Sequence, residues 1–141
     1  DKPCGPTSQD IVRQARKFFN TKVGHTGTLD PLATGVLPLV VGRATRLAQF
    51  LQTDDKEYEA ELRLGETTDT FDREGQMLTK HSIPEISTHQ SQSVISQFVG
   101  EIQQQPPMFS AVKVDGNKLY KLARQNRIVE RPFRTVSVFS L

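Results

Sequence analysis

Hydrophobic and polar positions alternate along the chain with periods that predict several short elements. The clearest helical pattern covers residues 6–20, PTSQDIVRQARKFFN, where apolar side chains recur at helical spacing. Thr7 and Asp10 fit a capping box at the start of this helix. The positions expected to face the interior are Ile11, Val12, Ala15, Phe18 and Phe19.

The clearest strand pattern covers residues 56–65, KEYEAELRLG. Apolar and charged side chains alternate there, which predicts a strand with one buried face and one face in water. Residues 75–78 are expected to form a partner strand. The positions assigned to the buried face are Tyr58, Ala60, Leu62 and Leu64.

Shorter patterns and turn signals fill the rest of the chain. The pair Asp115-Gly116 signals a turn, and the run QQQPPMF breaks regular structure. Helices mixed with strands predict an α+β fold around an antiparallel or mixed sheet. Strands are expected at residues 36–42, 110–114 and 134–141, and helices at residues 43–52, 87–100 and 117–125. In the first two of these helices, the inward-facing positions are Leu47, Phe50, Leu51, Val94, Ile95, Phe98 and Val99.

Length and composition limit the possible classes of protein. The 141 residues suffice for one domain or for part of a larger one. No apolar run approaches the roughly 20 residues of a membrane-spanning helix, and no signal peptide is visible. Cys4 is the single cysteine, which excludes an internal disulfide and a cysteine metal cluster. We therefore expect a cytoplasmic protein without a membrane partner.

Charge is distributed unevenly along the chain. The overall net charge is only +2, but residues 113–134 carry seven cations against two acids. Residues 54–75 carry nine acids against three bases. This asymmetry suits a molecule with one face directed at a polyanion, although ordinary solvated charge would give the same counts.

Residues 23–38, VGHTGTLDPLATGVLP, hold one aspartate in an unusual setting. Asp30 precedes Pro31, and proline biases the residue before it to an extended conformation. Neighbouring glycines permit tight turns on either side, so the carboxylate is expected to be held in a fixed position. The segment DPLATG also fits a short helix with Asp30 as its N-cap, and the two interpretations are compatible.

Other familiar sites are not indicated by the sequence. The phosphate-loop, dinucleotide-binding and serine-elbow motifs are missing. His25, His81 and His89 share no metal-ligand spacing. Asp69 and Asp72 lie in TTDTFDREG, which lacks the spacing of a calcium loop, so these two aspartates are predicted to serve as turn and cap residues.

Four segments resemble motifs of the TruB-type tRNA pseudouridine synthases, in the family's order. GHTGTLDPLATGVLP is similar to the family signature, and DKPCGPTS to its K-P-x-G-x-[ST]-S opening. DKEYEAELRLGETTDTFDREG resembles its tyrosine strand and the T-D-T-x-D-x-x-G turn that follows. QQPPMFSAVKVDGNKLYKLARQN resembles its P-P-x-x-S-A-x-K-x-x-G segment. The four segments span nearly the whole chain, which makes the resemblance specific.

The resemblance implies a fold, a reaction and roles for individual residues. The fold would be the α+β pseudouridine synthase fold, with a mixed, mainly antiparallel sheet flanked by helices and loops. The reaction would convert uridine to pseudouridine at position 55 in the T loop of tRNA, without a metal or organic cofactor. Asp30 would be the catalytic nucleophile, attacking the base or the sugar. His25 would fill the space left by the extruded uridine, and Tyr58 would stack on the flipped base.

The same resemblance gives the basic segment a partner and implies an incomplete chain. Lys113, Lys118, Lys121 and Arg124 are expected to contact phosphates of the tRNA T arm. Lys2 and Pro3 match the family's structural opening beside the active site. The complete protein is expected to be a monomer. Residues 1–141 would form the N-terminal portion of the catalytic domain, with its C-terminal part and the RNA-binding domain absent.

Two questions stay open at this stage. The family's K-G-T-Y-[IV]-R motif, whose arginine pairs with the catalytic aspartate, is absent, and Arg43 and Arg46 are only near Asp30 in sequence. One alternative function is a non-catalytic RNA-binding or RNA-folding protein on the same scaffold. Another is a glycosidase acting on a small nucleoside, although such enzymes usually need two catalytic carboxylates and only Asp30 has a suitable setting.

Overall fold

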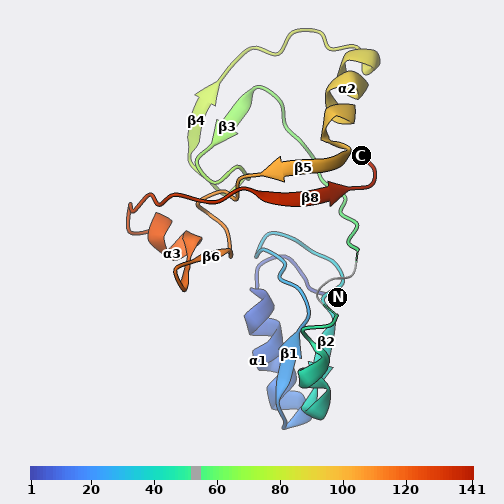
Figure 1. Cartoon of the computed structure of the whole chain (residues 1–141), viewed down its shortest axis with the longest axis vertical. Coiled ribbons are helices and arrows are strands. Elements are labelled where there is room, and N and C mark those ends of the chain that lie inside the picture. The colour runs from blue at the N-terminus through green and yellow to red at the C-terminus, as the bar shows by residue number, and fades with distance from the viewer. Residues whose placement is uncertain (52–54) are drawn as a thin grey trace. The chain divides into compact units, whose positions relative to one another are not determined.

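The computed structural model describes residues 1–51 and 55–141, which divide into two compact units (Figure 1). The first unit comprises Asp1–Ala60 and the second comprises Glu61–Leu141. Gln52, the last residue of a predicted helix, and Asp54, the first of the acidic segment, lie outside the described residues.

The first unit begins with helix α1, Ser8–Phe19, which confirms the predicted helix. Its capping box is present: the Asp10 backbone N–H donates to Thr7 Oγ1 at 3.1 Å, and the Thr7 backbone N–H donates to the Asp10 carboxylate at 3.0 Å. Val12 is buried as expected. Phe18, however, is 83% exposed and packs edge-to-face against Phe19, so the predicted inward face is wrong in the last turn, where the two rings cover each other.

Helix α1 lies along a two-stranded antiparallel sheet (Figure 1). Strand β1, Val23–His25, pairs with β2, Leu39–Val41, with Val23 opposite Val41. The second strand confirms the pattern at residues 36–42, whereas β1 is too short and glycine-containing to produce a pattern of its own. The 3-10 helix η1, Gly42–Leu47, replaces the helix expected over residues 43–52.

The inward face predicted for that helix is also wrong. Leu47, Phe50 and Leu51 are all largely exposed. The 3-10 helix ends at Leu47, and Phe50 and Leu51 lie in the turns that follow it, where their N–H groups donate to the carbonyls of Leu47 at 3.0 Å and Ala48 at 3.2 Å. The three side chains therefore do not lie along one face of an α-helix.

The buried residues of the first unit include polar side chains as well as apolar ones. The apolar ones are Val12, Val23, Leu37 and Val40, and the polar ones are Lys2, Ser8 and Thr26. Buried polar groups require hydrogen-bond partners, so these three positions are places where side chains are expected to hold the backbone or one another through hydrogen bonds.

The strand predicted at residues 56–65 is not formed. Tyr58 is 68% exposed and Leu62 is 82% exposed, and the segment has no regular structure. The alternating pattern shows which side chains a strand would bury, but a strand also needs a neighbour for its backbone N–H and C=O groups. No described strand pairs with this segment. The partner predicted at residues 75–78 does form a strand, but it pairs with a different segment.

The second unit opens with that strand pair. Strand β4, Met77–Lys80, runs antiparallel to β3, Glu66–Thr68. Lys80 Nζ lies 3.4 Å from a Glu66 carboxylate oxygen, and the hydroxyls of Thr67 and Thr79 hydrogen bond at 2.6 Å. These cross-strand pairs stabilise the pairing of β4 with β3, whereas the sequence predicts a pairing of residues 75–78 with residues 56–65.

Helix α2, Thr88–Ile95, and the 3-10 helix η2, Ser96–Phe98, form the helix predicted over residues 87–100. The predicted inward residues Val94, Ile95, Phe98 and Val99 are nevertheless exposed. Strand β5, Gly100–Gln104, then pairs along its full length with β8, Arg134–Val138, which confirms the strand predicted at the end of the chain.

Between β5 and β8 lies a small hairpin followed by a helix. Strands β6, Lys113–Val114, and β7, Asn117–Lys118, are joined by the predicted turn, where Asp115 and Gly116 have φ values of 48° and 78°. Two successive residues in the left-handed region are typical of a type I′ hairpin turn. Helix α3 follows as Leu119–Ala123 and buries Leu119 and Leu122.

These elements confirm the α+β class. All strand pairs in the described residues are antiparallel, and they form four two-stranded sheets rather than one continuous sheet. None of the helices in residues 1–51 and 55–141 has the length and apolar character needed to cross a membrane.

Candidate functional site

Asp30 lies on the loop of residues 26–38, which connects β1 to β2. The Ala33 N–H donates to the Asp30 carbonyl at 3.1 Å, so residues 30–33 form a β-turn with Pro31 at its second position. The short helix that DPLATG could have formed is therefore not present. Asp30 is exposed, and no described side chain hydrogen bonds or ion pairs with its carboxylate.

Lys2 holds the C-terminal side of this turn. Its side chain is fully buried, and its Nζ donates to the carbonyls of Pro3 at 2.9 Å, Pro31 at 3.1 Å and Ala33 at 2.7 Å. An ammonium group has three donors, so all of them are used. The Lys2 backbone also pairs with Gly35 through hydrogen bonds of 2.8 Å and 3.2 Å.

The N-terminal side of the turn is held by helix α1. The Leu29 N–H donates to Ser8 Oγ, and the Ser8 hydroxyl donates to the Leu29 carbonyl, both at 2.9 Å. On the other side of Asp30, the Gly5 N–H adds a 2.8 Å hydrogen bond to the Pro31 carbonyl, which also accepts from Lys2. The backbone on both sides of Asp30 is thus fixed, while the carboxylate itself points to solvent-accessible space.

His25 ends strand β1 and pairs with Leu39 in the sheet. It is half-buried, and its Nδ1 is buried without a hydrogen-bond partner among the described residues. The strand that carries it is tied to α1, because the Arg16 guanidinium donates to the Val23 carbonyl at 3.0 and 3.2 Å. No hydrogen bond among the described residues joins His25, Asp30 and Tyr58.

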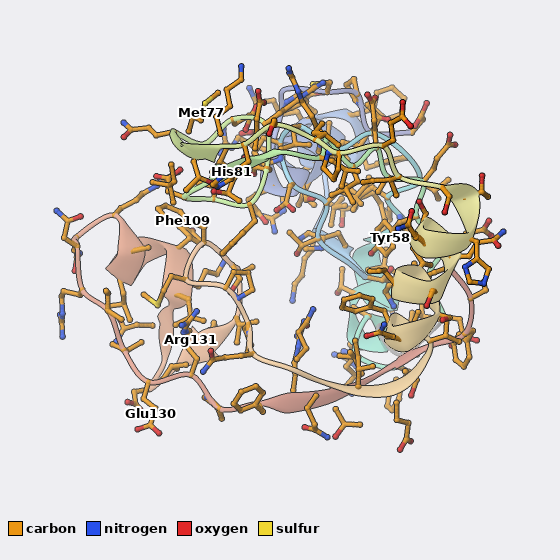
Figure 2. The ribbon with its side chains drawn as sticks, turned by 90° about the horizontal axis from the view of Figure 1, so that it is seen from above. Tyr58, Met77, His81, Phe109, Glu130 and Arg131 are labelled. Atoms are coloured by element: carbon orange, nitrogen blue, oxygen red, sulfur yellow. The ribbon has the colours of Figure 1, made fainter. Side chains whose placement is uncertain are left out.

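Tyr58 lies in the irregular segment before the second unit and is largely exposed (Figure 2). The interpretation of its ring as part of a buried strand face is therefore wrong. An exposed ring is free to contact a ligand, because few protein atoms cover it.

A basic hollow of about 300 Å³ lies at the opposite end of β1 and β2 from the Asp30 loop. The Gly42 N–H donates to the Lys22 carbonyl at 2.7 Å, which brings the residue before β1 next to the residues after β2. The three cations on this hollow, Lys22, Arg43 and Arg46, form no ion pair within the described residues. The residues that line the hollow are Thr21, Lys22, Gly42, Arg43, Thr45 and Arg46.

This cluster was missed at the sequence level, because its cations lie some 20 positions apart and only the β1–β2 pairing joins them. Arg43 and Arg46 belong to this cluster and make no ion pair with Asp30. The cation that would accompany the Asp30 carboxylate is therefore not supplied by either arginine in the described structure.

A second basic cluster surrounds Tyr120 in the other unit. Lys118 Nζ lies 5.7 Å from the Tyr120 ring centroid, and Arg124 Cζ lies 5.5 Å from it. Lys113 is directly opposite Lys118 across β6 and β7. Like charges directly opposite each other on paired strands are destabilising, so an anion bound there would relieve a repulsion within the hairpin. Lys121, on helix α3, is exposed.

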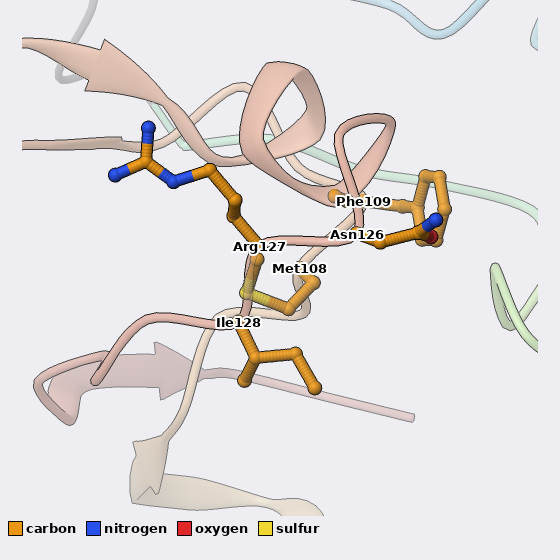
Figure 3. A pocket seen from close by; sticks show the side chains of 6 residues that line it. Met108, Phe109, Asn126, Arg127 and Ile128 are labelled. Atoms are coloured by element: carbon orange, nitrogen blue, oxygen red, sulfur yellow. The ribbon is translucent and has the colours of Figure 1, made fainter.

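Next to this cluster is a hollow of about 280 Å³ (Figure 3). Its lining is mostly apolar, with Arg127 as its cation, and it consists of Met108, Phe109, Ala123, Asn126, Arg127 and Ile128. Arg131, also in this region (Figure 2), donates from Nη1 to the Pro106 carbonyl at 3.0 Å. This bond ties the segment after α3 to the segment after β5.

The two aspartates of TTDTFDREG serve the turn, as predicted. Asp69 accepts from the Gln76 N–H at 2.8 Å, and Asp72 accepts from the Glu74 N–H at 2.9 Å and from the Thr70 hydroxyl at 2.7 Å. Residues 1–51 and 55–141 contain no group of three or more side chains suited to a metal ion.

Comparison with known proteins identifies the family. A family model described as "TruB family pseudouridylate synthase (N terminal domain)" matches residues 15–141. The chain belongs to the TruB family. A tRNA pseudouridine synthase B of Dechloromonas aromatica is 52% identical over 142 residues, covering 100% of the chain and 47% of the relative. One of Fusobacterium nucleatum is 49% identical over 139 residues, covering 98% of the chain and 48% of the relative.

This TruB-family chain therefore spans about half the length of the curated relatives it matches. It also resembles a chain in the crystal structure of a Cbf5-Nop10-Gar1 complex, with a TM-score of 0.56 and 30% sequence identity. That match covers 97% of the TruB-family chain and 31% of the other. The family model and the named relatives agree with the family expected from the four motifs.

Proposed function

We propose that the protein containing this chain is a tRNA pseudouridine synthase that isomerises uridine 55 in the T loop. The observation that carries the proposal is the Asp30 loop, in which an exposed carboxylate is carried on a backbone that is held by hydrogen bonds on both sides. The relatives named tRNA pseudouridine synthase B support the substrate class. We further propose that the protein acts on the T arm as a monomer in the cytoplasm.

The proposed reaction exchanges one bond to C1′ of the ribose for another. The N1–C1′ bond breaks, the base turns, and a C5–C1′ bond forms, while C5 loses its hydrogen and N1 gains one. Because this is an isomerisation, no oxidant or reductant is required, and the family resemblance implies no cofactor. Asp30 acts as the nucleophile, on the base or on the sugar. A carboxylate is a weak nucleophile, so its rate depends on accurate placement.

A uridine within folded RNA must leave its stack before C1′ can be attacked. Leaving costs a few kcal/mol, and stacking on an aromatic side chain returns about 1–3 kcal/mol. The exposed ring of Tyr58 suits this stacking role. His25 would occupy the space that the base vacates, and its rigid place at the end of β1 favours that role.

Affinity for RNA would come from the basic clusters. The Tyr120 cluster, which we define as Lys113, Lys118, Lys121 and Arg124, offers cations around an aromatic ring. The Lys22 cluster, defined as Lys22, Arg43 and Arg46, offers three cations free of ion pairs in the described residues around a hollow. Phosphate contacts of this kind position RNA but carry little sequence information.

The substitution Asp30→Asn tests the proposal in the full-length protein. Uridine isomerisation, measured as tritium release from RNA labelled at uracil C5, should be abolished, while tRNA affinity stays nearly unchanged. Asp55→Asn removes a charge from another exposed aspartate of the same unit and should leave activity intact.

Full activity of Asp30→Asn would show that Asp30 is not the nucleophile. A wild-type protein that binds tRNA but releases no tritium would instead support an RNA-binding or RNA-folding protein on the same scaffold.

A further inference from the structure

The Ser8 side chain connects helix α1 to the residue that precedes Asp30. Its hydroxyl group both accepts from the Leu29 N–H and donates to the Leu29 carbonyl, with two distances of 2.9 Å. Both polar groups of one loop residue are thus satisfied by a single side chain. Ser8 is only 3% exposed, so water does not compete for these bonds.

Helix α1 makes Ser8 a rigid point of attachment. Ser8 is the first residue of the helix, and Thr7 immediately before it forms the capping box with Asp10. Ser8 is also buried, and a serine side chain has a single rotatable bond before its oxygen, so the surrounding packing limits where the hydroxyl can lie. The position of Ser8 Oγ is therefore determined by the helix, and the position of the Leu29 backbone follows from it.

On its side of Asp30, the contact from Ser8 is the described hydrogen bond nearest the turn, because the next one, from the Thr26 N–H to the Pro38 carbonyl at 3.2 Å, lies three residues before Leu29. On the other side, the Pro31 carbonyl accepts from both Lys2 and Gly5. Within the described residues, Leu29 has hydrogen bonds to Ser8 alone. Loss of the Ser8 hydroxyl would therefore free the N-terminal side of the turn and leave the C-terminal side in place.

We propose that Ser8 is a positioning residue for the Asp30 carboxylate. It acts through the Leu29 backbone and does not touch the substrate. The proposal rests on the proposed function, since it requires that Asp30 carry the chemistry. Small displacements of a reacting group are sufficient to matter, because a misplacement of about 1 Å can slow a reaction by about 100-fold.

The competing explanation is that Ser8 only stabilises the end of α1. Thr7 provides the matched control, because it is the neighbouring residue, carries a hydroxyl and caps the same helix without contacting the loop. Thr7→Ala should lower the melting temperature with no change in the rate of the chemical step. Ser8→Ala should lower the rate.

The experiment uses the full-length protein as wild type, Thr7→Ala and Ser8→Ala. For each protein it measures single-turnover tritium release, tRNA affinity and melting temperature. For Ser8→Ala we expect a rate reduced about 10- to 100-fold and an affinity within about twofold of wild type. Amide exchange of Leu29 should be slow in wild type and in Thr7→Ala, and fast in Ser8→Ala.

A rate for Ser8→Ala within about twofold of wild type would overturn the proposal. So would an equal loss of rate in Thr7→Ala, because the effect would then belong to helix stability. If Ser8→Ala does not fold, Ser8→Cys keeps the shape with a much weaker hydrogen-bonding group and should show the same split. Failure of both to fold, with Thr7→Ala folded, would assign Ser8 to the fold and reject the positioning role. An inactive wild type would reject the proposed function, while amide exchange of Leu29 would still report whether Ser8 holds the Leu29 backbone.

Discussion

At the scale of single residues, the Asp30 loop depends on a charge that is buried without a carboxylate partner. Lys2 is fully buried, and in the described structure its ammonium meets three backbone carbonyls and no acid. Hydrogen bonds from a charged donor contribute about 1.5–3 kcal/mol each, which offsets the cost of removing the charge from water. The lysine side chain thus supplies hydrogen bonds to the carbonyls of Pro31 and Ala33, which no described strand pairs with.

Lys2→Met tests this account through stability. The Pro31 carbonyl would keep its bond from Gly5, but Pro3 and Ala33 would lose their donor. We expect the free energy of unfolding to fall by about 1–3 kcal/mol in urea titrations. Lys17→Met removes an exposed lysine of α1 and should change it by less than about 0.5 kcal/mol. Equal effects of the two substitutions would contradict a specific role for Lys2.

Tyr58 should behave as a surface residue in stability and as a binding residue in function. Because its side chain is 68% exposed, Tyr58→Ala should lower the free energy of unfolding by no more than about 0.5 kcal/mol. A buried tyrosine would cost about 3–5 kcal/mol instead. Activity should be lost in Tyr58→Ala, with binding retained in Tyr58→Phe, in the tritium-release and tRNA-binding assays. A large loss of stability with normal activity would assign the ring to packing.

At the scale of elements, local signals were predictable from sequence and pairing was not. Helix α1 and the turn at Asp115 follow from residues within a few positions of each other, and both were predicted correctly. The Tyr58 segment carries a clear strand pattern, but a strand needs a partner that the pattern does not name. The motifs pointed to Asp30 and placed Lys2 in an opening beside the active site. The hydrogen bonds by which Lys2 and Ser8 hold the loop were not predictable, because both residues are distant from the loop in sequence and generic in type.

The capping box of α1 makes the helix sensitive to acid. Hydrogen bonds from the Thr7 side chain and backbone lower the pKa of Asp10 below its ordinary value of 3.8, with a smaller contribution from Arg13. A carboxyl group with a lowered pKa stabilises the folded state above its unfolded pKa, and this stabilisation is lost as pH falls through the folded pKa. We expect the melting temperature to decrease below about pH 4 in wild type.

Asp10→Asn is the control for that acid dependence. The asparagine keeps a capping oxygen but cannot titrate, so the difference in melting temperature between the two proteins should shrink as the pH is lowered from 6 to 2.5. A constant difference over that range would show that Asp10 does not contribute to the pH dependence.

At the scale of the whole molecule, each of the two units carries its own basic cluster. The Lys22 cluster depends on the pairing of β1 with β2, and the Tyr120 cluster depends on the β6–β7 hairpin and α3. Folding therefore brings together cations that are separated in the sequence. A polyanion such as RNA can neutralise both clusters, because its phosphates repeat along the chain.

Salt titrations of tRNA binding can separate the two clusters. Each lost phosphate contact reduces the slope of log affinity against log salt by about 0.7–1. Replacing Lys118, Lys121 and Arg124 by glutamine should therefore reduce the slope by about two to three units, and replacing the Lys22 cluster should do the same. A control with Lys17 and Arg73 replaced should keep the wild-type slope. An unchanged slope for either cluster would identify it as an ordinary solvated surface.

Burial of the Lys2 ammonium also has a consequence for chemical reactivity. Acylating reagents attack free amines, so exposed lysines such as Lys17 and Lys121 should be labelled at once, while Lys2 can react only during moments when the loop of residues 26–38 detaches. The slow labelling of Lys2, followed by mass spectrometry of its peptide, would thus time the opening of the Asp30 loop in the unmodified protein. Bound RNA that presses on this loop should lengthen that time, and a loop that opens freely would leave Lys2 as reactive as its neighbours.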